Sequence, residues 1–227
     1  KSRVRMPLMI TGAIPSTVKR EKLAALVDAG LYTIRMGIET AAESTKKMYL
    51  RPQTNKRVQR AAEAINEFKD IIQKPLYDVI LDNPWETDEE VVHTLVFLAG
   101  LPAPFSLSLF SLVFYPGTEL YEKAKADGLV KNDLEDVYRK HFRGCRNTYL
   151  NRLYFLLNDY ASSGVNISQR VMRMLTSKWG RKLYLSQSLY LAMKGFALLL
   201  RFKYLATEGI MSIQKKDWAR IQRYRLK

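Results

Sequence analysis

The stretch "YTIRMGIETAAESTKKMYLRPQT" (residues 32–54) places a short apolar segment before a carboxylate and then a polar segment with helical composition. The apolar segment, residues 32–38, is typical of a strand and ends at Glu39. A strand followed by a helix is the repeating unit of parallel sheets. An ionised Glu is almost never buried without a partner, so a Glu at the end of a buried strand indicates a ligand.

The same order of strand and helix occurs four times in the first 130 residues. Strands are predicted at 7–11, 32–38, 76–81 and 105–114, and helices at about 17–28, 42–50, 55–72, from 88 onward and within 117–128. Strands joined by helices form parallel sheets with right-handed crossovers. Four units are too few to close an eight-unit barrel, so they predict an α/β fold that forms half of a (β/α) barrel or the end of an open sheet.

Polar and turn-forming residues follow each predicted strand. They are "TG" at 11–12, "ET" at 39–40, "DNPWET" at 82–87 and "YPGTE" at 115–119. The carboxyl ends of parallel strands meet at one edge of the sheet, where α/β proteins bind their ligands. We therefore expect the binding site of this chain at that edge.

Charge is distributed unevenly along the 227 residues, whose net charge is +15. Residues 1–150 hold 22 Lys and Arg against 19 Asp and Glu, whereas residues 151–227 hold 15 against 3. A basic appendage of this kind meets nucleic acid or an anionic membrane. The single cysteine, Cys145, excludes an internal disulfide and a metal site built from this chain's cysteines alone.

The pattern predicts two regions, a half-barrel over 1–131 and a basic helical extension over 132–227. In the extension, Lys194, Arg201 and Lys203 interrupt the apolar stretch 183–206, which makes it a poor membrane span. Its apolar residues recur on one helical face: Leu183, Leu189, Met193, Phe196, Leu200 and Tyr204. Packing against the barrel, a helix on an anionic membrane surface and a spanning helix all remain open.

Three side chains and one turn are candidates for ligand binding. Glu39 and Asp78 could accept hydrogen bonds from the vicinal hydroxyls of a ribose, and Arg51 could bind a carboxylate. The "PGT" turn at 116–118 would let the backbone approach a flat ring. The alternatives are structural, since Asp78 could cap a loop, Arg51 could pair with a surface acid, and the turn could simply start a helix.

Three segments together resemble the second half of the radical S-adenosylmethionine core, in the class with an N-terminal cobalamin-binding domain. They are "IRMGIETAAESTKKMYLRPQT", "YDVILDNPWETDEE" and "LFSLVFYPGTELYEKAKADGLV", and the resemblance covers about residues 5–131. It implies an enzyme in which a [4Fe-4S] cluster, reduced by an electron donor, cleaves S-adenosylmethionine to a 5′-deoxyadenosyl radical that abstracts hydrogen from a substrate. Cobalamin is a further cofactor that this class implies.

The resemblance also implies roles for individual residues. Glu39 and Asp78 would bind the ribose, and Arg51 would bind the methionyl carboxylate. The adenine would lie against one apolar side chain and the backbone of one turn, namely Ile80, Pro116 and Gly117. These residues would orient the nucleotide and would not act as acid or base catalysts.

The sequence departs from the family in one respect: it contains no CxxxCxxC loop, and Cys145 alone cannot hold a cluster. We expect this chain to be the C-terminal part of a larger enzyme, inactive by itself, or a degenerate chain without radical chemistry. Cys145 is expected to be an incidental thiol and His141 a surface histidine. Trp85 is expected to pack or plug the barrel mouth, with stacking on a ligand as the alternative.

The remaining expectations concern partners and location. No apolar signal region precedes the first strand, so the sequence predicts a cytoplasmic protein, peripheral to a membrane if the extension binds lipid. The substrate would be a small or lipid-like molecule. Two rivals stay open: a nucleic-acid-binding module that uses "KKDWARIQRYRLK" at 215–227, and a non-radical barrel that binds an adenosyl ligand.

Overall fold

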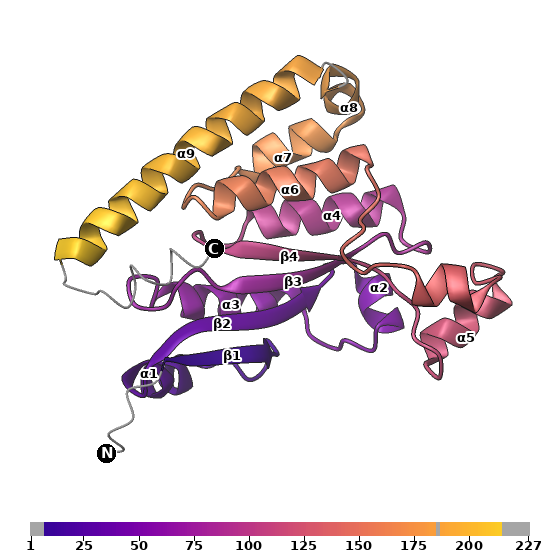
Figure 1. Ribbon diagram of the computed structural model, residues 1–227, viewed down its shortest axis with the longest axis horizontal. Helices are drawn as coiled ribbons and strands as arrows, with labels where there is room; N and C mark the ends of the chain where they lie inside the picture. The colour runs from indigo at the N-terminus through magenta and orange to yellow at the C-terminus, as the bar shows by residue number, and fades with distance from the viewer. Residues whose placement is uncertain (1–6, 185–186, 215–227) are drawn as a thin grey trace.

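Four parallel strands form the sheet in the computed structural model, which describes residues 7–184 and 187–214 (Figure 1). The strands are β1 (Leu8–Ala13), β2 (Leu31–Glu39), β3 (Leu76–Leu81) and β4 (Ser106–Ser111). They lie side by side in chain order, and each pairs in parallel with the next. The predicted parallel α/β fold is therefore confirmed.

Helices follow each strand. They are α1 (Arg20–Asp28), α2 (Glu43–Met48), α3 (Asn55–Asn66), α4 (Asp88–Ala99) and α5 (Glu119–Ala126). The helix predicted over 55–72 ends earlier, at Asn66, and the chain then turns until the amide of Gln73 donates to the carbonyl of Tyr32 (2.6 Å). That bond returns the chain to the sheet at the start of β3.

Local sequence explains where α4 begins. The Thr87 hydroxyl accepts from the amide of Glu90, and the Glu90 carboxylate accepts from the amide of Thr87. This reciprocal pair satisfies two amides that a helix start would otherwise leave without a partner. The predicted start near Asp88 is confirmed.

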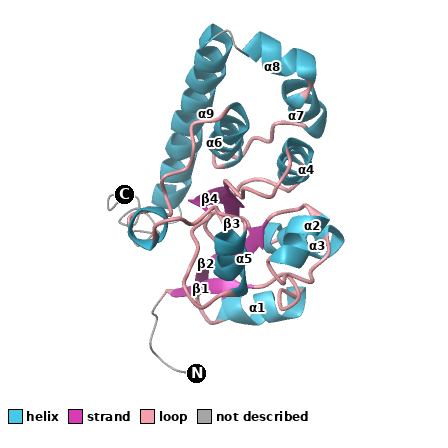
Figure 2. Ribbon diagram, turned by 90° about the vertical axis from the view of Figure 1, so that its right-hand side faces the viewer, coloured by secondary structure: helices cyan, strands magenta, loops and turns pink. Residues whose placement is uncertain are grey.

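The two faces of the sheet differ in chemistry. Sequential strand order with right-handed crossovers places the connecting helices on one side, as in a barrel, and Figure 2 shows α1 and α3 together on one side of the sheet. The residues turned toward the helices are buried and mostly apolar: Ile34, Met36, Ile38, Tyr77, Val79 and Leu81. The alternate residues on the other face include Arg35, Glu39 and Asp78, which are only partly buried. The sheet thus resembles part of a barrel, with one apolar face under the helices and one polar face.

The helical extension covers the β4 side of the sheet. It comprises a short π-helix (Leu134–Tyr138), α6 (Tyr149–Ala161), α7 (Gln169–Thr176), α8 (Lys178–Tyr184) and α9 (Gln187–Gln214). Figure 1 shows α6 beyond β4 and α4, and α9 as the outermost helix. Leu153 and Tyr154 of α6 belong to the same buried cluster as Tyr77 of the sheet. The predicted boundary at 131/132 lies between α5 and the π-helix.

Within residues 7–184 and 187–214, no helix is both long and apolar enough to cross a membrane. The 28-residue α9 has the length, but Lys194, Arg201 and Lys203 interrupt it. The described helices therefore give no support to the spanning alternative.

Two buried tyrosines provide a matched test of the core. Tyr77 is fully buried against Phe105, and its hydroxyl has no hydrogen-bond partner among the described residues. The hydroxyl of Tyr154 donates to the carbonyl of Val91 (3.2 Å). We expect Tyr77→Phe to raise the free energy of unfolding by about 1–2 kcal/mol and Tyr154→Phe to lower it by about 1 kcal/mol, measured by urea denaturation. Shifts of the same sign would contradict this account.

Candidate functional site

The backbone at the end of β2 is distorted where Glu39 emerges. Gly37 lies opposite Asp78 in β3 but Glu39 lies opposite Val79, so the register shifts at a bulge between them. The φ angle of Glu39 is 65°, in the left-handed region. A bulge re-aims the side chain that follows it, and a left-handed non-glycine residue costs about 1–2 kcal/mol. Strain of this kind is typical of binding sites.

Gly37 leaves the space that the Glu39 side chain occupies. A Cβ atom placed on Gly37 would lie 2.6 Å from Oε1 of Glu39, closer than Cβ atoms approach other atoms in proteins. The carboxylate therefore folds back over the glycine on the polar face of the sheet. A larger residue at this position would displace the carboxylate.

Burial and a nearby cation act on Glu39 in opposite directions. The side chain is only 14% exposed, and this burial raises the pKa of its carboxyl group, although Arg51 opposes the shift. Nη2 of Arg51 lies 3.6 Å from Oε1 of Glu39, which is ion-pair distance but too long for a hydrogen bond. Arg51 thus pairs with an acid of the predicted site and not with a surface acid.

The end of α2 positions Arg51. The amide of Arg51 donates to the carbonyl of Lys46 (2.8 Å) and that of Leu50 donates to Lys47 (3.1 Å), a helix-ending turn with Leu50 in the left-handed position. The φ angle of Leu50 is 53°, and glycine is the usual residue there. This turn directs the next side chain, Arg51, back toward the end of β2.

Asp78 already has a cationic partner. Nε of Arg35 donates to both carboxylate oxygens at 2.8 Å, and the Asp78 side chain is 17% exposed. The guanidinium of Arg35 also lies 5.3 Å from the centre of the Phe110 ring. The sequence prediction missed Arg35, although its spacing from Glu39 by four residues along a strand places both on one face.

Four of the six predicted residues line one cleft. A cavity of about 210 Å³ is lined by Glu39, Asp78 and Ile80, and a neighbouring one of about 490 Å³ by Glu39, Arg51 and Ile80. Both cavities also share Leu112, Val113 and Tyr115 as lining residues. We call the two cavities together the strand-end cleft.

Pro116 and Gly117 lie beside the strand-end cleft without lining either cavity. Both are exposed, and the cleft is instead lined by their neighbours Tyr115 and Thr118. Gly117 has a φ of 86°, and Thr118 then caps α5 by accepting from the amide of Tyr121. The turn therefore starts a helix, as the structural alternative predicted.

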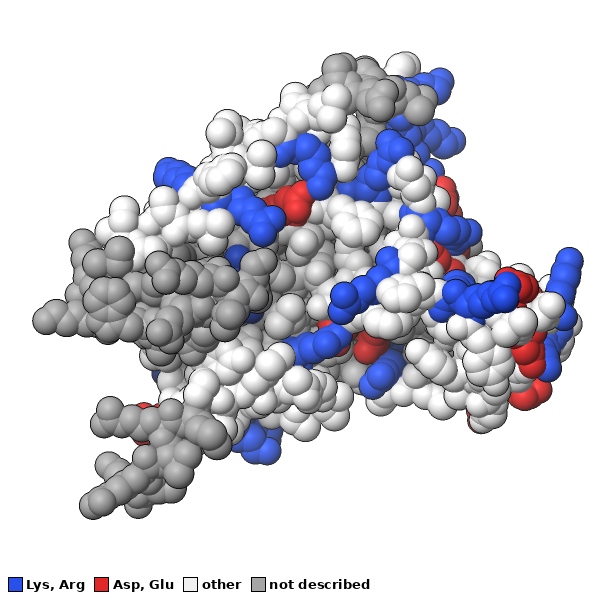
Figure 3. Space-filling view, viewed as in Figure 1, with Lys and Arg blue, Asp and Glu red and all other residues white. Residues whose placement is uncertain are grey.

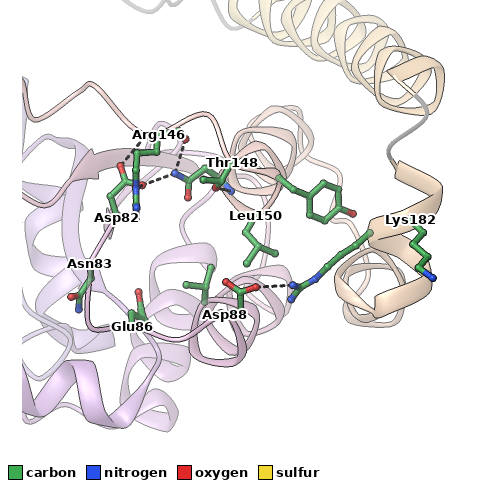
Figure 4. A pocket seen from close by; sticks show the side chains of 12 residues that line it. Asp82, Asn83, Glu86, Asp88, Arg146, Thr148, Leu150 and Lys182 are labelled. Carbon is green, nitrogen blue, oxygen red and sulfur yellow. Dashed lines mark hydrogen bonds and ion pairs between the residues drawn. The ribbon is translucent and has the colours of Figure 1, made fainter.

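Apart from the strand-end cleft there is another cavity, of about 470 Å³, which we call the second cavity. It opens between the end of β3, the start of α4, and helices α6 and α8 (Figure 4). Its polar lining has both signs of charge: Asp82, Glu86, Asp88, Arg146, Arg181 and Lys182. Arg181 pairs with Asp88 at 2.7 Å, which links α8 to α4. Sequence analysis placed part of this cavity at a strand end but missed the residues that α6 and α8 supply.

Asp82 holds the segment before α6 against the sheet. Its carboxylate is 4% exposed and accepts from the amide (2.9 Å) and Nε (3.1 Å) of Arg146 and from Nδ2 of Asn151 (2.8 Å) (Figure 4). Burial opposes ionisation, but these hydrogen bonds and one from Ser111 outweigh it and lower the pKa of Asp82. This buried acid is therefore ionised and structural.

A further buried carboxylate, that of Glu86, lines the second cavity. Its Oε1 accepts from the hydroxyls of Thr40 (3.0 Å) and Thr45 (3.2 Å), while burial raises its pKa. Burial also raises the pKa of Tyr49, and Glu86 and Glu39 add to that shift. Asn83 lies beside the Tyr49 hydroxyl and opposes the shift, yet neither that hydroxyl nor Nδ2 of Asn83 has a hydrogen bond of good geometry in the described part of the chain. A water molecule, an ion or a ligand could each supply the missing hydrogen bonds.

Trp85 packs, as expected. Its Nε1 donates to Asp127 (2.7 Å) and its ring meets Phe114 edge-on at 5.7 Å, so it joins the β3–α4 loop to α5. His141 is exposed and stacks on Phe142, which agrees with its prediction as a surface histidine.

The residues of this chain do not fit an iron–sulfur cluster. Burial raises the pKa of the Cys145 thiol, which disfavours the thiolate that iron binds. Among the described residues, no group of three or more His, Cys, Asp or Glu could hold a metal ion. Thiolates for a cluster would have to come from outside residues 1–227.

No family model matches the chain, and no curated protein matches it. Among solved structures the chain is similar to coproporphyrinogen III oxidase (HemN) from Escherichia coli, described as a radical SAM enzyme, with 20% identity and a TM-score of 0.45. The match covers 52% of this chain and 26% of that one, so the chain spans about a quarter of its length. This similarity gives no support to the cobalamin-binding class.

The Asp82 contacts predict a pH-dependent effect of one substitution. Asp82→Asn removes the charge and replaces one of the two acceptor oxygens by an NH2 donor, and it should lower the free energy of unfolding by about 1–3 kcal/mol at pH 7. Because the folded-state pKa of Asp82 lies below 3.8, the carboxylate stabilises the fold above pH 3.8 and ceases to do so as the pH falls through its folded-state pKa. Urea denaturation at several pH values should show the difference between the proteins shrinking below pH 3.8. A constant difference would contradict the assignment.

The left-handed turn at the end of α2 predicts a gain in stability. Leu50 is 75% exposed, so its side chain contributes little burial. Leu50→Gly should raise the free energy of unfolding by about 1 kcal/mol, because glycine adopts positive φ without steric cost. Thermal denaturation would measure it, with Leu129→Gly as an exposed control without positive φ, which should lose stability.

Proposed function

We propose that the strand-end cleft binds S-adenosylmethionine and that the chain is part of a radical S-adenosylmethionine enzyme. The observation that supports this most is that Glu39, Asp78 and Ile80 line one cavity and that Arg51 lines its neighbour. Two carboxylates, an apolar side chain and a guanidinium match the hydroxyls, the flat base and the carboxylate of this ligand.

Arg51 is available to bind a ligand carboxylate. Its contact with Glu39 is an ion pair of 3.6 Å without a hydrogen bond, and its side chain is 43% exposed. The guanidinium can therefore direct a pair of N–H donors at a carboxylate without leaving Glu39. A ligand carboxylate there would also place a negative charge near Glu39, which the cation between them offsets.

Asp78 can bind a hydroxyl without losing Arg35. A carboxylate offers about four acceptor positions, and Nε of Arg35 occupies one on each oxygen. A ribose hydroxyl would use a remaining position on the cavity side. Ile80 is two residues further on the same strand face, where a base could lie against it.

Radical chemistry would require a cluster that this chain does not hold. A second polypeptide segment with three thiolates would supply the cluster, and cobalamin is implied only by the resemblance to its class. A non-radical barrel with the same cleft is the alternative. The two differ in whether S-adenosylmethionine is cleaved reductively when a cluster-bearing segment, iron, sulfide and a reductant are present.

Substitutions in the strand-end cleft should weaken ligand binding. We expect Glu39→Gln and Asp78→Asn each to cost about 1–3 kcal/mol of affinity for S-adenosylmethionine in calorimetric titration. Glu63→Gln, an exposed acid on α3, is the matched control and should bind like the unmodified chain. Gly37→Ala should also weaken binding, because its methyl group would displace the Glu39 carboxylate.

Stability measurements separate a lost contact from a damaged fold. Burial raises the folded-state pKa of Glu39, so its ionisation costs stability as the pH rises above 4.5. Glu39→Gln should therefore be more stable than the unmodified chain at pH 7 while binding less ligand. Unchanged affinity in both Glu39→Gln and Asp78→Asn would refute the ribose assignment.

A further inference from the structure

Helix α9 carries apolar side chains on two opposite faces. One face is packed against α6 and the core and includes Met193, Ala197 and Leu200. The other face is exposed by 38–66% and comprises Leu191, Leu198, Leu199, Phe202 and Leu205. We call this second set the outer face of α9. Burial on one side explains the first face and leaves the outer face without an explanation.

Specific contacts fix which face of α9 points outward. The Tyr160 hydroxyl of α6 donates to the carbonyl of Met193 (3.2 Å), and Lys194 pairs with Asp159. Further along the helix, the Tyr204 ring packs against Gly164, and a Cβ atom added to this glycine would lie 3.4 Å from the ring. These contacts anchor the helix along its length, so it cannot roll its outer face inward.

This arrangement decides among the alternatives for the predicted stripe. Met193, Leu200 and Tyr204 pack against the protein, and Phe196 lies at the border with its ring 6.2 Å from that of Tyr160. The side chains of Leu183 and Leu189 lie outside the described part of the chain. A surface-binding face, if present, must be the opposite one.

Basic residues border the outer face on both sides. At 100° per residue, Lys194 and Arg201 follow one edge of the apolar face and Lys203 lies at the other. Neither Arg201 nor Lys203 has an ion pair with any side chain that the structure describes. Apolar residues bordered by cations are typical of helices that lie in the interface of an anionic bilayer.

A groove runs along one edge of the outer face. Its volume is about 450 Å³, and its lining combines apolar and basic residues: Leu191, Gly195, Leu198, Lys194, Arg201 and Asp159. Gly195 has no atom within 4 Å of an added Cβ, so the glycine leaves a gap between two leucines. The groove could hold an acyl chain along the leucines with an anionic headgroup at Arg201.

The surroundings of α9 favour an anionic partner. Asp159 is the only acid among the side chains of α6–α9 that the structure describes. Figure 3 shows a largely uncharged surface over α9 with blue Lys and Arg among it and one small red area. Figures 1 and 2 agree that α9 is the outermost element on its side of the molecule.

We propose that the outer face of α9 binds the surface of an anionic lipid bilayer. Burial of its leucines and Phe202 in the acyl boundary would hold the helix, and Arg201 and Lys203 would meet the phosphates. A nucleic acid would attract the cations but would leave the leucines in water. The inference does not depend on the ligand of the strand-end cleft, so either proposal can fail without the other.

The experiment is co-sedimentation of the full 227-residue chain with vesicles of phosphatidylcholine alone and of phosphatidylcholine with phosphatidylglycerol. Binding should rise with the anionic lipid and fall as salt is added. Leu198→Asp with Phe202→Asp should lower the partition coefficient at least tenfold, whereas Ile71→Asp, an equally exposed apolar site on the other part of the molecule, should leave it unchanged. Arg201→Gln and Lys203→Gln should each lower it about fivefold, and only with anionic vesicles.

Circular dichroism and thermal denaturation confirm that each variant is folded before its binding is compared. Equal binding to neutral vesicles, or no binding to either kind, overturns the proposal. Binding to an oligonucleotide but not to vesicles also overturns it, in favour of a nucleic-acid surface. The outer face could instead pair with a second copy of the chain. The result would then be dimerisation without vesicle binding, abolished in the variant with both Leu198→Asp and Phe202→Asp.

Discussion

The right-handed crossover between parallel strands is the constraint on which the rest of the structure depends. Because the four strands lie in chain order, each crossover returns its helix to the same side of the sheet. One face therefore forms the apolar core, and the other is free to carry Arg35, Glu39 and Asp78. A sheet wound in both directions would have covered both faces with helices and left no room for an ion pair between strands.

Binding capacity and stability oppose each other at the strand ends. Glu39 and Asp82 both have backbone φ angles in the left-handed region. Burial disfavours the ionised form of Glu39, whereas hydrogen bonds to the carboxylate of Asp82 offset the effect of its burial. The difference separates their roles, since Asp82 fastens the segment before α6 and Glu39 retains unused acceptor positions. The ligand binding proposed for the strand-end cleft would give a role to a carboxylate whose ionisation destabilises the fold.

The helical extension connects two surfaces of different chemistry. Its inner helix, α6, shares the core with the sheet and supplies Asn151 to the Asp82 contacts, so the second cavity exists only because the extension is docked. Its outer helix, α9, is held by α6 and presents leucines and cations to the surroundings. Packing on one side thus decides what the opposite side can bind.

The sequence alone determined the order of strands and helices, because alternation in β2 and β3 and the cap at Thr87 are local signals. It also brought Glu39, Asp78 and Ile80 to one edge, since parallel strands end together. Only the tertiary structure decided that Arg35 donates to the carboxylate of Asp78 and that the turn at Leu50 directs Arg51 toward the end of β2. It also decided that Asn151 donates to Asp82, which is 69 residues away in the sequence. It also decided which apolar face of α9 is buried, because a helix that is apolar on two sides carries no local signal to choose between them.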